Sequence, residues 1–163
     1  MKFTAQEEYG LRILLRIAQS HSPNGLTIPE ISQLEGLSQA NTAKILRVLR
    51  LGGFIDSARG QSGGYKLTRI PELIKISDVL EKLGGKLFKT SFCHDYSGQE
   101  TICTNSIDCS IRSVWRAIQT SVDSILSKLT LRELMTDEAS ANLLVEKISQ
   151  MEEAKRQSLA QSR

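Results

Sequence analysis

A glycine-rich stretch, residues 59–64, constrains the fold of this chain more than any other feature, because short strand patterns flank it and short helix patterns precede it. The strand patterns cover residues 54–58 and 65–68. Glycine permits the backbone angles of tight turns, so two β-type runs around such a tip are typical of a small hairpin. We therefore predict a hairpin over residues 54–68.

Three helix starts precede the hairpin. Thr4–Glu7 and Thr27–Glu30 each have the form of a capping box, in which a hydroxyl and a carboxylate satisfy free backbone N–H groups of the first turn. Ser38 is a candidate cap for a third helix, which ends at Gly52–Gly53. The turn at Gly36 joins the second and third helices as a helix-turn-helix. With the hairpin, this order predicts a mainly α fold of the winged helix-turn-helix class.

Positive charge is concentrated in the same region. Residues 38–69 contain six basic side chains and one acidic side chain, a net charge of +5, whereas the whole chain carries +3. A local basic patch on a winged helix favours a nucleic-acid partner, although a solvated helix face gives the same pattern. The first turns of a recognition helix meet base edges and phosphates. The candidate contacts there are Ser38, Gln39, Asn41 and Lys44. For Gln39 and Asn41, an exposed polar face without a ligand is the alternative.

The second half of the chain predicts further helices. Ser77 is a candidate cap for a helix that ends at Leu83. Apolar residues then recur at positions 111, 115, 118, 122, 125 and 129, the heptad spacing of a coiled-coil seam. We expect this helix to form a homodimer, with packing against the winged domain as the alternative. A last amphipathic helix is expected over about residues 137–151, followed by a polar, fraying end at 152–163.

Three cysteines lie between these two halves. Cys93, Cys103 and Cys109 are separated by nine and then five residues, which is not the paired spacing of classical zinc sites. Three thiolates in an irregular, glycine-containing segment suit an iron-sulfur cluster, because iron in such clusters prefers soft sulfur ligands. Three reduced thiols without a ligand are the alternative. Local candidates for a fourth ligand are His94, Asp95 and Asp108.

Composition and motifs limit the class of protein to which this chain can belong. The chain has 163 residues, 40% hydrophobic and 24% charged, as expected for one soluble domain with an appended element. No apolar run is long enough to cross a membrane and no signal-peptide pattern opens the chain, so we expect a cytoplasmic protein. It contains no nucleotide-binding loop and only two histidines, which argues against an enzyme.

We divide the chain into four parts. A winged helix-turn-helix spans 1–83 and a cysteine-containing sensor loop spans 84–110. A dimerisation helix spans 111–130, and a C-terminal helical element with its polar tail spans 131–163.

Several segments together resemble a known family. Met1–Thr4 followed by Tyr9, the turn Glu35–Ser38 and above all Arg59–Leu67 are similar to the bacterial winged-helix regulators typified by IscR, NsrR and CymR. The last segment matches the wing signature Arg-Gly-x-x-Gly-Gly-Tyr-x-Leu without a gap. The similarity extends from Met1 to about Leu134. It implies that the wing, with Arg59, Gly60 and Tyr65, contacts DNA; an arginine at such a tip fits the narrow, electronegative minor groove.

The resemblance also bears on sequence readout and on the ligand set. One recognition-helix position that influences sequence choice is Glu in IscR and Ala43 here, so the same operator is not expected. The histidine that supplies the fourth ligand in IscR is replaced by Arg112, and arginine does not bind metal. In the NsrR branch an acidic residue of the partner subunit completes the site, and the matching residue here is Glu8. The first interval between cysteines is longer than in the cluster-binding members.

The sequence thus predicts a homodimeric, DNA-binding transcription regulator that senses nitric oxide, oxygen, redox state or iron supply through an iron-sulfur cluster of the 2Fe-2S or 4Fe-4S type. The alternative is a cluster-free regulator of the same fold that uses a thiol redox switch or a protein partner.

Overall fold

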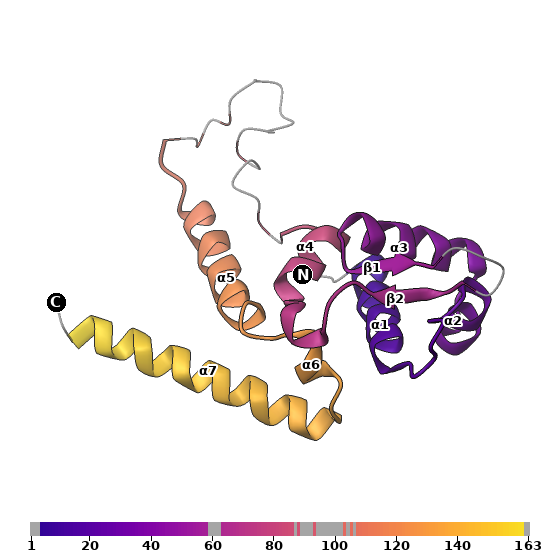
Figure 1. The fold of residues 1–163 in the computed structure, drawn as a ribbon. Coiled ribbons are helices and arrows are strands. Elements are labelled where there is room, and N and C mark those ends of the chain that lie inside the picture. The colour runs from indigo at the N-terminus through magenta and orange to yellow at the C-terminus, as the bar shows by residue number, and fades with distance from the viewer. Residues whose placement is uncertain are drawn as a thin grey trace.

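The structure, a computed structural model, describes residues 4–58, 63–86, 88, 93, 103, 105 and 107–161. Its fold is mainly helical, with one two-stranded hairpin, and agrees with the predicted winged helix-turn-helix (Figure 1). The elements are α1 (Ala5–Gln19), α2 (Ile28–Glu35), α3 (Gln39–Leu51), β1 (Ile55–Ser57), β2 (Tyr65–Leu67), η1 (Pro71–Leu73), α4 (Ile76–Leu83), α5 (Ser110–Leu126), α6 (Leu131–Leu134) and α7 (Glu138–Gln161).

The predicted caps start the first three helices. The Glu7 carboxylate accepts a hydrogen bond from the backbone N–H of Thr4 at 2.7 Å, and Glu30 accepts one from Thr27 at the same distance. The hydroxyl of Ser38 accepts a hydrogen bond from the N–H of Asn41 at 3.3 Å. These bonds confirm both capping boxes and the cap of α3, because each satisfies backbone groups that the first turn leaves free.

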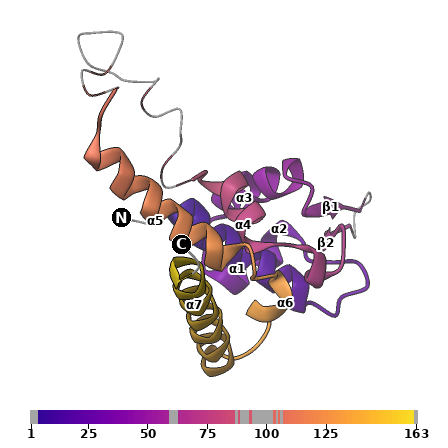
Figure 2. The same cartoon turned by 90° about the vertical axis from the view of Figure 1, so that its left-hand side faces the viewer.

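The hydrophobic core lies where α1, α2, α3 and α4 meet (Figure 2). Phe54 and Ile55 close it from the hairpin side, each 1% exposed. The core residues that α1 to α4 contribute are Ile13, Leu14, Ile17, Ile31, Ile45, Leu46, Leu49, Ile76, Val79, Leu80 and Leu83. This packing fixes the helix-turn-helix on a rigid base.

The hairpin is antiparallel, with Ile55 opposite Leu67 and Ser57 opposite Tyr65. Its strands are shorter than the predicted 54–58 and 65–68. Phe54 donates its backbone N–H to Leu49 near the end of α3 (3.1 Å), and only its carbonyl, which accepts the N–H of Thr68 (3.1 Å), bonds to the opposite side of the hairpin. Leu26, between α1 and α2, exchanges backbone hydrogen bonds of 3.2 and 2.8 Å with Tyr65 and fastens the hairpin to the helical part.

The predicted cap of α4 is wrong. The helix begins at Ile76, its N-cap is Lys75, and the hydroxyl of Ser77 bonds instead to Asp78 (3.1 Å). The cause is a long-range contact: the backbone N–H of Ile76 donates to the carbonyl of Leu129 at 2.9 Å. This bond fixes the start of α4 against the segment that follows α5.

Helices α5 and α7 extend from the winged part to one side, whereas α6 lies against it, with Leu131 fully buried (Figure 1). Helix α5 ends at Leu126, so the seam position Leu129 lies beyond it and is buried in the core. Helix α7 is longer than predicted, because it continues to Gln161 instead of fraying from residue 152. Residues 152–161 contain no glycine or proline and are rich in good helix formers, which explains the continuation.

Candidate functional site

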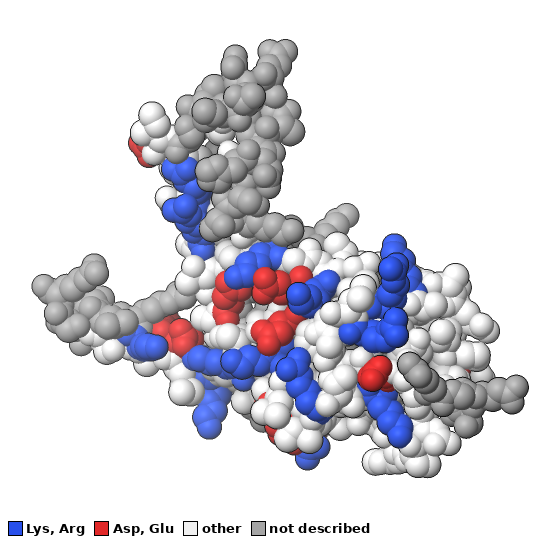
Figure 3. Space-filling view, turned by 45° about the horizontal axis from the view of Figure 1, so that its top comes forward, with Lys and Arg blue, Asp and Glu red and all other residues white. Residues whose placement is uncertain are grey.

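Helix α3 presents a basic outer face. Its buried residues, Thr42, Ile45, Leu46 and Leu49, all point to the core. Of the predicted contact residues, Ser38, Gln39 and Lys44 are exposed, and Asn41 is half-buried. Figure 3 shows basic side chains over α3 and the hairpin, on the right of that view. The structure thus brings the first-turn residues and Lys44 to the surface of one helix.

Two further basic residues lie on this face. From the sequence they were predicted only to contribute to the positive charge of the region, and not as DNA contacts. Arg47 and Arg50 are exposed and follow Lys44 at intervals of three residues along α3. Spacing of three to four residues along a helix places side chains on neighbouring positions of one surface. This periodicity was the signal that could have identified them.

Of the predicted DNA contacts in the hairpin, the structure describes only Tyr65. Arg59 and Gly60 lie outside the described residues. Tyr65 is half-buried and packs against the core while its backbone pairs with Leu26. Lys66 is exposed and donates a hydrogen bond to the carbonyl of Pro23, which ties β2 to the loop between α1 and α2.

The three cysteines are partly exposed and form no disulfide among themselves. Cys109 is the N-cap of α5, and its sulfur accepts a hydrogen bond from the N–H of Arg112 at 3.4 Å. In the part of the chain that the structure describes, no three Cys, His, Asp or Glu side chains converge into a metal-binding group. The thiols have the donor chemistry of a soft-metal cluster, but the described residues of one chain do not assemble it.

The candidate fourth ligands are placed as follows. The side chain of Glu8 is 63% exposed and lies 3.8 Å from Arg12, one turn further along α1. Asp108 is exposed, whereas His94 and Asp95 lie outside the described residues. Glu8 is therefore accessible to a second molecule, and its contact with Arg12 is a weak, solvated ion pair.

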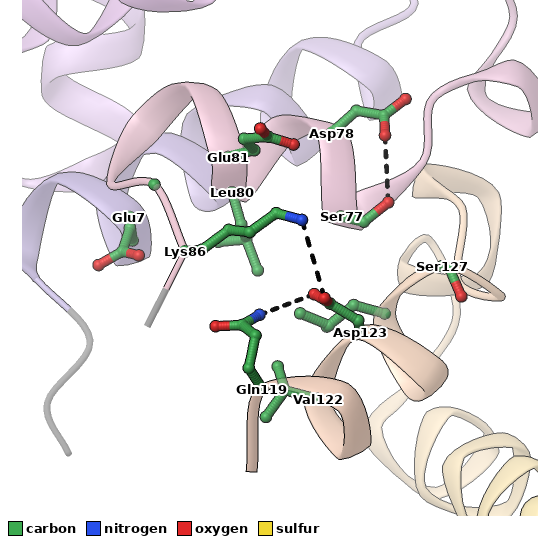
Figure 4. A pocket seen from close by; sticks show the side chains of 12 residues that line it. Glu7, Ser77, Asp78, Leu80, Glu81, Lys86, Gln119, Val122, Asp123 and Ser127 are labelled. Carbon is green, nitrogen blue, oxygen red and sulfur yellow. Dashed lines mark hydrogen bonds and ion pairs between the residues drawn. The ribbon is translucent and has the colours of Figure 1, made fainter. Parts of the chain in front are cut away.

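A cleft of about 230 Å³, lined by both polar and apolar side chains, lies between the winged part and α5 (Figure 4). Glu7 and α4 line one side and α5 lines the other. Across it, Lys86 approaches Asp123 at 3.8 Å, and within α5 the Gln119 amide donates to the same carboxylate at 2.8 Å. The Lys86–Asp123 contact and the packing of Ile125 and Leu126 against the core join α5 to the winged part.

No helix in the described part of the chain has the length and apolar character needed to span a membrane.

Comparisons with known proteins match this architecture. The family model Rrf2, described as an iron-dependent transcriptional regulator, matches residues 3–137. Protein rrf2 of Nitratidesulfovibrio vulgaris is 33% identical over 137 residues, covering 84% of this chain and 89% of the relative. The transcriptional regulator IscR of Aliivibrio salmonicida is 28% identical, covering 84% of this chain and 79% of the relative.

A solved structure has a similar fold. CymR, the global cysteine regulator of B. subtilis, superimposes with a TM-score of 0.66 at 27% identity, covering 84% of this chain and 99% of that chain. The relatives are named as transcriptional regulators, so this protein is a transcription regulator and not an enzyme. Helix α7 lies beyond the residues that the family model matches. On its sequence and its fold, the chain belongs to the Rrf2 family of winged-helix transcriptional regulators.

Proposed function

We propose that this regulator binds double-stranded DNA as a homodimer and that the cysteine segment sets its DNA affinity. The observation that carries DNA binding is the exposed basic face of α3, with Lys44, Arg47 and Arg50. Such side chains bind phosphates, and Ser38, Gln39 and Asn41 at the start of the helix read base edges. To Arg59, Gly60 and Tyr65 of the wing we assign the contacts with the minor groove. The protein acts in the cytoplasm, where bacterial DNA is found.

Dimer formation is supported by α5. None of its residues is buried, although the helix is strongly one-sided in its apolar content. Ile111 is 64% exposed and Trp115 is 45% exposed. An exposed apolar stripe with heptad spacing is typical of a helix that pairs with a second copy.

The sensor we propose is an iron-sulfur cluster held by Cys93, Cys103 and Cys109, with Glu8 of the partner subunit as the fourth ligand. When bound, such a cluster supplies redox chemistry and an iron that reacts with small molecules such as nitric oxide. The support is the soft donor set in one segment and the exposure of Glu8. Cys109 caps α5, so a change in the conformation of this segment acts directly on the start of the helix assigned to the dimer.

Purification without oxygen, followed by an absorption spectrum with iron and sulfide assays, tests this proposal. We expect visible absorption with iron and sulfide in equal amounts. Glu8→Ala should lower cluster retention or shift the spectrum. Glu7→Ala is the matched control, because Glu7 bonds to Thr4 and its loss should cost only ~1 kcal/mol of helix stability. Identical spectra and rates of cluster loss for the wild type and Glu8→Ala would remove Glu8 from the ligand set.

A second candidate is a cluster-free regulator whose thiols form a redox switch or whose dimer binds a protein partner. The observation that favours it is the absence of any three converging ligands among the described residues. Protein purified without oxygen that contains neither iron nor sulfide, yet binds DNA in a thiol-dependent manner, would establish this candidate.

A further inference from the structure

Glu35 is a buried carboxylate at the junction of the helix-turn-helix. It is the last residue of α2, and its side chain is 3% exposed. Burying a charge is costly unless partners surround it. Both partners come from α1: Arg12 Nε lies 3.0 Å from one carboxylate oxygen and Arg16 Nε lies 2.8 Å from the other.

This arrangement connects two elements that are distant in sequence. Arg12 and Arg16 are one turn apart on α1, so together they hold both oxygens of Glu35 and define its position relative to α1. Hydrogen bonds to charged groups are the strong ones, and two of them fix orientation as well as distance. The last residue of α2 is thereby fastened to α1.

The turn that follows Glu35 is held in one conformation by hydrogen bonds. Gly36 has the left-handed conformation with φ of 66° and Leu37 donates its N–H to the carbonyl of Ser32 at 3.0 Å. The Ser32 hydroxyl also bonds to the carbonyl of Leu37. Ser38, the cap of α3, comes next. A displacement at Glu35 is therefore transmitted across two residues to the first turn of α3.

We infer that Glu35, held by Arg12 and Arg16, is a positioning residue that sets the first turn of α3 for base contacts. It does not touch DNA, and the inference rests on the proposed DNA binding by α3. Its role is to keep Ser38, Gln39 and Asn41 at a fixed place relative to the rest of the winged domain. Loss of the anchor should thus weaken sequence-specific binding while leaving phosphate contacts in place.

Two substitutions of opposite charge test this role. Glu35→Gln removes a negative charge and Arg16→Gln removes a positive one. If only long-range charge matters, the first variant binds all DNA more tightly and the second binds all DNA more weakly. If the anchor positions α3, both variants lower the ratio of specific to non-specific affinity.

The measurement uses the full-length protein, an operator selected from a random pool and a scrambled duplex of equal length, each titrated at several salt concentrations. We expect both variants to lose about tenfold in the affinity ratio, equivalent to ~1.4 kcal/mol, with an unchanged salt slope for operator binding. Matched controls are Glu72→Gln and Arg132→Gln, which break an exposed ion pair (3.6 Å) between η1 and α6 and should leave the ratio unchanged.

Several outcomes overturn the inference. They are an unchanged ratio in both variants, parallel changes in specific and non-specific affinity, or a salt slope that falls by about one in Arg16→Gln, which would make Arg16 a phosphate contact. Arg16 is 42% exposed, so that variant carries the test if Glu35→Gln does not fold. Lys44→Ala separates the two proposals: if its affinities and salt slope match the wild type, α3 does not face DNA and the proposed function fails first.

Discussion

At the scale of the single residue, Thr42 on α3 is an unusual member of the core. It is fully buried, and its hydroxyl is the one buried side-chain N or O atom of the described residues that has no hydrogen-bond partner. A buried hydroxyl without a partner has lost its hydration and regained nothing. The residue therefore lowers stability on the helix that carries the proposed DNA contacts.

Thr42→Val replaces this hydroxyl with a methyl group of similar shape. We expect the free energy of unfolding to rise by ~1 kcal/mol, because the desolvation cost of the hydroxyl disappears. DNA affinity should not change, since Thr42 points away from the outer face of α3. Denaturant titration measures the effect, and Thr42→Ser, which keeps the hydroxyl and loses a methyl, should be less stable than the wild type. A valine variant no more stable than the wild type would mean that the hydroxyl has a partner.

Glu30 gives a residue-scale prediction about pH. The backbone N–H and the hydroxyl of Thr27 hold the pKa of Glu30 below its ordinary value of 4.5. A carboxyl whose folded pKa is lowered stabilises the fold above its unfolded pKa, and this contribution is lost as the pH falls through the folded pKa.

Glu30→Gln lacks that titration, so its stability should fall less than that of the wild type when the pH is lowered from neutrality to below 4.5. Thermal melts across this range measure the difference. Parallel pH profiles for the two proteins would contradict the assignment.

At the scale of the element, α1 and α4 approach each other closely at Gly10. A Cβ atom at this position would lie 2.5 Å from both Cδ atoms of Leu83. Gln6 also donates a hydrogen bond to the carbonyl of Leu83, so this crossing holds the end of α4 against the first turns of α1. The cysteine segment begins just beyond that point.

Gly10→Ala should therefore destabilise the fold, even though alanine favours a helix over glycine by about 1 kcal/mol. Overpacking a filled core costs about 1–3 kcal/mol, which exceeds the gain from helix propensity. A second substitution, Leu83→Ala, removes the clashing atoms, so the two changes should be less harmful together than their sum. The melting temperatures of the wild type, the two single variants and the double variant measure this coupling. Strictly additive effects would contradict the close contact between Gly10 and Leu83.

The elements differ in how far the sequence could predict them. The starts of α1, α2 and α3 were predictable because their caps are local, within three residues. The start of α4 was not, since Ile76 bonds to Leu129, far along the chain. The outer face of α3 follows from helical period, and so do its basic residues. The Glu35 anchor joins positions 19 and 23 residues apart, and no local pattern indicates such a contact.

At the scale of the whole molecule, the winged part and α5 have different kinds of packing. The winged part surrounds a closed apolar core, whereas α5 has no buried residue. Ile125 and Leu126 at the end of α5 pack against the core, and Lys86 and Asp123 form a polar contact across the cleft. An exposed ion pair of this kind is weak, so in the proposed dimer the second copy fixes the position of the first turns of α5. In the proposed mechanism, a change in the cysteine segment acts on these first turns.

The dimer itself is tested by a charge at the centre of the α5 stripe. Ile118 is half-buried in the single chain, so Ile118→Glu leaves the monomer fold intact but places two like charges in the proposed interface. We expect sedimentation to show monomers that no longer bind an operator with two half-sites. Ser113→Glu is the matched control, because Ser113 is exposed on the opposite side of α5.

The only tryptophan of the chain reports on the same interface. Trp115 is 45% exposed in the single chain and lies in the stripe, so dimer formation should bury it. Its fluorescence should shift to shorter wavelength as the concentration of wild-type protein or of Ser113→Glu is raised, because a buried indole leaves water. Ile118→Glu should show no shift at any concentration. If Ile118→Glu remains dimeric and its tryptophan still becomes buried, the two copies meet through another surface, and the exposed stripe of α5 has a different partner.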